Sequence, residues 1–191
     1  MNPACKGGDG QARVHECDVP PAVISKRKKM NIVVANRQRT KKINPHLLKR
    51  IVQEIFVALA ITEAELGINL VAARAMTLVN ETFLQHDGST DVITFDHLHS
   101  DLDKEHPDLQ MHGEVFVCVD DALAQARQYK TSWQSEVVRY VAHGILHLQG
   151  YDDLKPALRR KMKRQENRLM RQISHRFDLR GLGTETNASA R

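Results

Sequence analysis

With 191 residues, 41% of them hydrophobic and 27% charged, the chain has an ordinary globular composition and is long enough for one well-buried domain with tails. Its formal net charge of +5 favours an anionic partner. No stretch is long and apolar enough to span a membrane, the N-terminus lacks a signal-peptide core, and the three cysteines form no C-x-x-C pair, so we expect a cytoplasmic protein without membrane contact.

Composition and periodicity divide the chain into a domain and two tails. Residues 1–29 are rich in Gly, Pro and charge and lack any periodicity, so a disordered N-terminal tail is predicted. Residues 30–176 are predicted to form the single domain, and residues 177–191 a flexible, polar C-terminal tail.

Within the domain, the spacing of hydrophobic residues predicts strands that alternate with helices. Strands are expected at residues 31–36, 68–71, within 87–95 and at 113–119. Helices are expected at residues 45–59, 75–83, 122–130, 132–148 and 158–173. Asn44 before Pro45 is a typical helix start, and Asp120 with Asp121 is predicted to cap the helix that follows them.

The polar stretch 96–112 lies between two predicted strands and is rich in histidine. Its four histidines are His97, His99, His106 and His112. Acids lie among them, so a second metal site is an alternative interpretation. A solvated loop is favoured, because no pair of these histidines has the spacing that ligands on one helix or hairpin would have.

The segment 143–153, with the sequence HGILHLQGYDD, carries the clearest chemical signal. His143 and His147 are four residues apart, which places both imidazoles on one face of a helix, one turn apart. Gly150 permits the left-handed turn that ends the helix, so that the chain can reverse and bring Asp153 to the same point. Two helical histidines and a third ligand predict an open metal site of the catalytic zinc type, with one position left to water.

Two other interpretations of this segment need to be weighed. The two histidines could simply be buried and hydrogen-bonded within an apolar helix. Alternatively, the pattern H-x3-H-x2-G-x2-D repeats the ligand spacing of the long zinc-protease motif, with Asp in place of the third His. Those proteases carry a glutamate general base at the position that is Gly144 here, so a zinc metallopeptidase is the weaker enzyme hypothesis.

The segment 155–176, directly after the metal motif, is strongly basic. It contains nine Lys or Arg residues and one acid, Glu166. Such a segment attracts phosphates without regard to sequence, although a solvated charged face is the alternative. The candidate nucleic-acid contacts are Arg159, Arg160, Lys163 and Arg164.

Two blocks of the sequence together resemble a known family. HGILHLQGYDD resembles the HGxLHLxGYDH signature of the bacterial YbeY endoribonucleases. The block NETFLQHDGSTDVITF, residues 80–95, is similar to that family's stretch N-x-x-Y/F-R-x-K-D-x-P-T-D-V-L-S-F. The shared positions are Asn80, Phe83, Asp87, Thr90, Asp91, Val92 and Phe95. The resemblance covers roughly residues 31–172, and two blocks in the family's order are more specific than one.

This resemblance implies an α/β (α+β) fold in which a small mixed sheet packs against helices, with the metal-bearing helix at the centre. It implies one Zn²⁺ ion per chain, held by His143, His147 and Asp153, and metal-dependent endoribonuclease activity specific for single strands. The substrate would be a precursor of 16S rRNA, cleaved during maturation of its 3′ end, with a further part in ribosome quality control. The expected partners are this RNA and the ribosome or its proteins, and not DNA.

The sequence departs from the family pattern at two functional positions. Asp153 stands where the family has its third histidine, which leaves room for nickel, iron or manganese, and Asp152 is the alternative ligand. Leu84 stands where the family has the arginine thought to act on the scissile phosphate. Leucine cannot neutralise phosphate charge, so Arg127 or the basic segment 155–176 would have to supply the cation.

The remaining roles follow from these ligands. His143 is expected to be catalytic as well as a ligand, and Asp91 is a second catalytic candidate, although an Asx turn explains that residue equally well. Three functions therefore remain for the structure to weigh: an endoribonuclease, a metallopeptidase, and a ribosome-binding assembly factor with a structural metal.

Overall fold

A computed structural model describes residues 30–98 and 110–183, and every structural statement below concerns these ranges. The predicted tail 1–29, the histidines His99 and His106, and residues 184–191 lie outside them. The strands are β1 (Met30–Asn36), β2 (Ala64–Val71), β3 (Val92–Asp96) and β4 (Met111–Cys118). The α-helices are α1 (Pro45–Ala58), α2 (Ala73–Val79), α3 (Val119–Tyr129), α4 (Trp133–Leu148) and α5 (Pro156–Arg176). Two short helical segments are η1 (Asn80–Leu84) and η3 (Leu179–Gly183).

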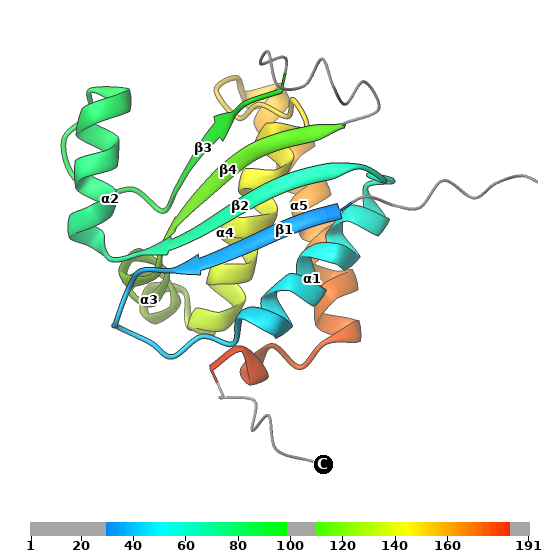
Figure 1. The fold of residues 1–191 in the computed structure, drawn as a ribbon, viewed down its shortest axis with the longest axis horizontal. Helices are drawn as coiled ribbons and strands as arrows, with labels where there is room; N and C mark the ends of the chain where they lie inside the picture. The colour runs from blue at the N-terminus through cyan, green and yellow to red at the C-terminus, as the bar shows by residue number, and fades with distance from the viewer. Residues whose placement is uncertain (1–29, 99–109, 184–191) are drawn as a thin grey trace, which may run out of the picture.

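The four strands form one mixed sheet in the order β1-β2-β4-β3. The pairs β1–β2 and β2–β4 are parallel, and β3 pairs with β4 in the antiparallel direction. Parallel neighbours need a crossover connection, which α1 provides between β1 and β2. Helices α1, α4 and α5 lie on one face of the sheet, with α4 in the middle (Figure 1). The α/β fold with a small mixed sheet and a central metal-bearing helix is confirmed.

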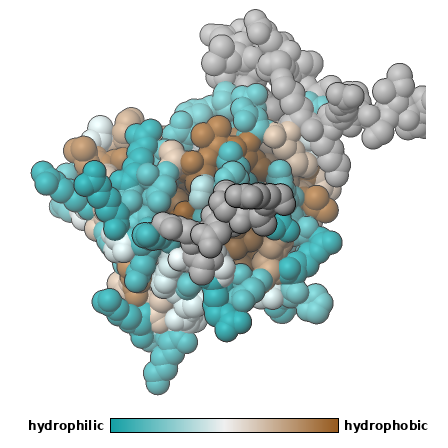
Figure 2. All heavy atoms as spheres, turned by 60° about the horizontal axis from the view of Figure 1, so that its bottom comes forward, coloured by the Kyte–Doolittle hydropathy of each residue, from teal (hydrophilic) through white to brown (hydrophobic). Residues whose placement is uncertain are grey.

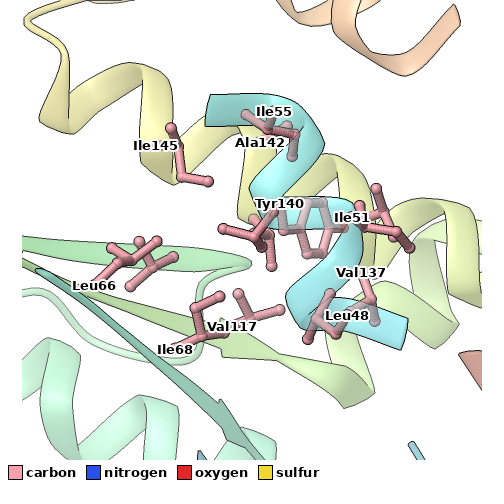
Figure 3. Packing of buried hydrophobic residues seen from close by; sticks show 14 of the residues in the cluster. Leu48, Ile51, Ile55, Leu66, Ile68, Val117, Val137, Tyr140, Ala142 and Ile145 are labelled. Carbon is pink, nitrogen blue, oxygen red and sulfur yellow. The ribbon is translucent and has the colours of Figure 1, made fainter. Parts of the chain in front are cut away.

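Helix α4 is central because it is apolar on almost every side. Val137, Val141 and Ile145 are completely buried, and Tyr140 is 5% exposed. Figure 3 shows side chains of α4 packed among those of α1 and of strands β2 and β4. Close packing on all sides fixes the side chains in single conformations, so the helix holds its polar residues rigidly.

Gly144 allows α4 to approach the sheet closely. A Cβ atom at this position would lie 2.6 Å from Cγ1 of Val115 and 3.1 Å from Cγ2 of Thr94. Real Cβ atoms do not approach other carbons this closely, so even alanine would force the helix and the sheet apart. A glutamate at position 144 would point into the sheet and not toward a metal ion, which removes the general base that a metallopeptidase of this motif requires.

The predicted boundaries hold at some elements and fail at others. Strand β2 begins at Ala64, four residues before the predicted start at residue 68. Helix α3 begins at Val119, and Cys118 occupies its cap position without a side-chain hydrogen bond, so the predicted aspartate cap is wrong. The carboxylate of Asp120 instead accepts hydrogen bonds from Ala73 N at 2.7 Å and from Thr40 Oγ1 at 2.8 Å. These long-range partners are invisible to a local cap rule.

The chain also continues in an ordered form beyond the predicted end of the domain. In η3, Leu179 is 9% exposed and Leu182 is fully buried, and the carbonyl of Leu182 accepts a hydrogen bond from Asn44 N. The structure therefore differs from the expected polar tail at residues 177–183. Seen from the end of the molecule where η3 lies, hydrophobic residues gather in the middle of the view and polar residues surround them (Figure 2). None of the described helices has the length and hydrophobicity needed to cross a membrane.

Candidate metal centre

Three side chains converge beside the C-terminal end of α4. Nε2 of His143 lies 3.1 Å from Nε2 of His147 and 3.8 Å from Oδ2 of Asp153. One ligand atom from each of the three lies within 4.8 Å of the others. Ligand atoms about 2.0–2.1 Å from a tetrahedral zinc ion lie about 3.3 Å apart, so the arrangement is compact enough for one small cation. The predicted convergence of His143, His147 and Asp153 is present in the structure.

The loop after α4 brings the aspartate to the histidines. Gly150 adopts a left-handed conformation with φ of 77°, and the amide of Tyr151 donates back to the carbonyl of Leu146 at 3.0 Å. The chain thus reverses at the predicted glycine. Of the two following acids, Asp152 accepts a hydrogen bond from Leu154 N at 2.9 Å and Asp153 faces the histidines. The structure therefore places the third ligand at Asp153 and gives Asp152 a turn-forming role.

Hydrogen bonds fix the protonation pattern of both imidazoles. Nδ1 of His143 lies 3.1 Å from Oε2 of Glu166, and Nδ1 of His147 lies 3.0 Å from the carbonyl oxygen of Tyr151. A carboxylate and a carbonyl can only accept, so both Nδ1 atoms donate. In the neutral rings the two Nε2 lone pairs then point at each other across 3.1 Å. Two facing lone pairs repel, and a cation between them removes the repulsion.

Glu166 is the residue that orients His143. Its side chain is 3% exposed, and its Oε1 accepts from Arg139 Nη1 at 2.5 Å and from Lys163 Nζ at 2.8 Å. Burial raises the pKa of Glu166, but the hydrogen bonds from His143, Lys163 and Arg139 lower it by more, to about 2. Glu166 is therefore a carboxylate at neutral pH. A carboxylate on the outer nitrogen of a metal-binding histidine raises the basicity of that histidine and fixes its orientation.

The sequence contained a signal for Glu166 that motif reasoning did not use. Met162, Leu169 and Ile173 form the buried stripe of α5, and Glu166 occupies the same stripe four residues after Met162. A buried acid in an apolar stripe must be paired with cations or donors. Its partner His143 is 23 residues away in the sequence, so the pairing itself could not be read from spacing.

The basic residues that were predicted to contact nucleic acid divide into two groups. Nε of Arg159 donates to the backbone carbonyl of Asp153 at 2.8 Å, and Lys163 is bonded to Glu166. These two residues support the ligand set from outside. Arg160 and Arg164 are exposed on α5, where they are available to a partner.

Asp91 does not belong to the group of converging ligands. Its side chain is exposed, and Oδ1 accepts hydrogen bonds from Val92 N at 3.0 Å and from Thr90 Oγ1 at 3.2 Å. This is the local turn that the sequence offered as the alternative explanation. Leu84 is 45% exposed, and in the described part of the chain no recorded contact ties Arg127 to the three ligands.

The histidine-rich stretch is organised differently from the expected loop. His112 lies in β4, and the amide of His97 donates to its carbonyl at 2.8 Å, so the two form a cross-strand pair. Their rings are 5.5 Å apart. Within the described ranges they do not join a third potential ligand in a group that could hold a metal ion.

Comparisons with known proteins agree with this site. A family model described as Endoribonuclease YbeY matches residues 28–174. The endoribonuclease YbeY of Myxococcus xanthus is 37% identical over 114 residues, which cover 60% of this chain and 38% of that protein. That of Chlorobium luteolum is 29% identical over 144 residues, which cover 75% of this chain and 98% of the relative.

A solved structure supports the fold independently. A protein from Thermotoga maritima, determined in solution, superposes with a TM-score of 0.58 at 23% identity and covers 83% of this chain and 99% of its own. At this identity the likeness concerns the fold alone. The family match, in contrast, spans the sheet, α4 and nearly all of α5. Because it covers well over half of the sequence, this chain belongs to the endoribonuclease YbeY family.

Proposed function

We propose that this protein is a metal-dependent endoribonuclease that cleaves single-stranded RNA. The observation that carries the proposal is the convergence of two oriented imidazole nitrogens and a carboxylate beside a strongly basic helix. The names of the relatives, all endoribonucleases, support the same reaction class. The metallopeptidase hypothesis is weaker, because Gly144 faces the sheet where that chemistry requires a glutamate base.

The donor set suits one Zn²⁺ ion per chain. Zinc is commonly held at catalytic sites by three protein ligands of the imidazole and carboxylate type, with a fourth position open. Such an ion would supply a Lewis acid and lower the pKa of bound water. The side chains of His143 and Asp153 are 21% and 38% exposed, so the site is open to a substrate from one side. The carboxylate in place of a third imidazole leaves room for nickel, iron or manganese.

The protein's own residues would position the reacting phosphodiester. Glu166 holds His143 in place, which is the catalytic contribution proposed for that histidine. Arg159, tied to the ligand loop through the carbonyl of Asp153, is the proposed cation for the phosphate in place of the family arginine. Asp91 is proposed to act only by shaping the turn before β3.

The biological setting is proposed from family membership. The substrate would be a 16S rRNA precursor, cleaved in the cytoplasm during maturation of its 3′ end. The ribosome or its proteins would be partners in this step and in ribosome quality control, and DNA would not be a substrate. The basic helix supports an RNA partner, since its charge favours polyanions.

Cleavage of single-stranded RNA with and without a chelator tests the proposed activity. Zinc-loaded protein is expected to cut the RNA, a chelator to stop the reaction, and added zinc to restore it. Asp153→Ala is expected to lower the rate at least about 100-fold, since it removes a ligand.

Asp152→Ala is the matched control, because this neighbouring acid only accepts a hydrogen bond from Leu154 N, and it is expected to retain most activity. A protein that retains zinc, binds ribosomes and cuts no RNA would instead be an assembly factor with a structural metal. Cleavage of a peptide substrate would favour the metallopeptidase.

A further inference from the structure

A continuous groove follows α5 away from the metal centre. A cavity of about 440 Å³ is lined by Tyr151 and by Lys161, Arg164, Arg168 and Arg171 of α5. A second cavity of about 630 Å³ lies between α4 and α5. Arg171 and Asn167 line both cavities, so the two form one groove, which is called the α5 groove below.

The α5 groove is positively charged without compensation. No Asp or Glu lines either cavity, and the one acid of α5, Glu166, is buried and paired below the surface. Arg164, Arg168 and Arg171 make no ion pair or hydrogen bond with any residue that the structure describes. Uncompensated arginines at this density repel one another, so a polyanion in the groove would relieve a real electrostatic cost.

The spacing of these arginines suits a phosphodiester chain better than a single anion. Positions 164, 168 and 171 lie on one stripe of the helix, and successive residues rise by about 6 Å and about 4.5 Å along its axis. Three fixed cations in a line can each meet a different phosphate. An isolated phosphate or carboxylate would use only one or two of them.

The groove begins at the metal centre itself. The carbonyl of Tyr151 orients His147, while the ring of the same residue lines the groove, with Nζ of Lys161 at 5.4 Å from the ring centre. Grooves that bind single strands combine a track of cations with aromatic rings on which bases stack. Tyr151 offers such a ring at the point where the strand would leave the site.

We infer that the α5 groove binds the backbone of single-stranded RNA on one side of the phosphodiester at the metal centre, through Arg164, Arg168 and Arg171. The choice of RNA rests on the proposed function. Of the contacts expected from the sequence, Arg164 belongs to this track, whereas Arg159 and Lys163 are engaged with the ligand loop and Glu166. Arg168 and Arg171 are additional contacts that the local motif did not suggest.

Binding measured without cleavage tests this inference. The Kd of a fluorescent single-stranded RNA of about ten nucleotides is measured in chelator, over a series of salt concentrations. Replacing Arg164, Arg168 and Arg171 together with glutamine is expected to reduce the slope of log Kd against log salt by about 2, at about 0.7 for each lost phosphate contact. For three contacts this equals a roughly 20-fold smaller change in Kd between 50 and 200 mM salt.

A control variant separates the groove from net charge. Replacing Arg39, Arg74 and Lys130 with glutamine removes three exposed cations from other elements and is expected to leave the slope nearly unchanged. Equal losses in both variants, or an unchanged slope in the groove variant, would overturn the inference. Both variants carry exposed substitutions, and their Tm values verify that they fold.

A substrate with a single phosphodiester distinguishes this inference from the proposed activity. A dinucleoside monophosphate cannot reach the groove, so the groove variant is expected to cleave it at the rate of the unaltered protein. If neither protein cleaves any RNA while the groove variant still loses binding, the proposed nuclease activity fails and the RNA-binding groove stands.

Discussion

Replacing His147 with alanine is expected to abolish zinc binding and, with it, RNA cleavage. The variant loses one of the three converging ligands and leaves Nε2 of His143 with only Asp153 opposite it. Loss of an outer partner of a ligand already costs about 10–100-fold in metal affinity or activity, so loss of a ligand itself should exceed about 100-fold. Isothermal titration with zinc, together with a single-strand cleavage assay, measures both effects.

His46→Ala is the matched control for this variant. His46 is exposed on α1, outside the converging group, and its loss is expected to change neither zinc affinity nor cleavage. If His147→Ala retained full cleavage while losing zinc, the metal would be structural or adventitious. Cleavage that survives without bound metal would also separate the reaction from this site.

Replacing Glu166 with glutamine is expected to weaken zinc binding by about 10–100-fold, although Glu166 does not touch the ion. An amide cannot stabilise His143 as a carboxylate does, and it loses the charge that Arg139 and Lys163 share. The same change should lower the free energy of unfolding by about 2 kcal/mol, because it leaves a partly buried cation without its carboxylate. Zinc titration and denaturant unfolding measure the two losses separately.

Lys163→Gln provides the comparison that isolates the orienting role. Lys163 bonds to the same carboxylate, but its side chain is 58% exposed, so its loss should cost little stability and little zinc affinity. If Glu166→Gln destabilised the fold yet bound zinc with unchanged affinity in its folded form, Glu166 would be a structural residue only.

The metal ligands could be predicted from the sequence because all three lie within eleven consecutive residues. Helical periodicity places His143 and His147 on one face, and the left-handed glycine at position 150 needs only local backbone rules. The start of α1 at Asn44 and Pro45 follows from equally local rules and is confirmed. Short-range geometry therefore carried the site and much of the secondary structure.

The failures all involve contacts between distant segments. The carboxylate of Asp120 bonds to Ala73 and Thr40 instead of capping α3, and Leu182 packs against a core that local composition does not reveal. Leu158, expected in the apolar stripe of α5, is 37% exposed because the helix leaves the core near its start. Glu166 belongs to the same class, since its role depends on the packing of α5 against α4.

The X-ray absorption spectrum of the zinc-loaded protein tests the central claim most directly. One ion per chain is expected, with two imidazole nitrogens at about 2.0–2.1 Å and a carboxylate oxygen at about 2.0–2.2 Å in the first shell, and a fourth light atom from solvent. A spectrum without imidazole scattering, or with oxygen ligands alone, would contradict a metal centre built from His143, His147 and Asp153.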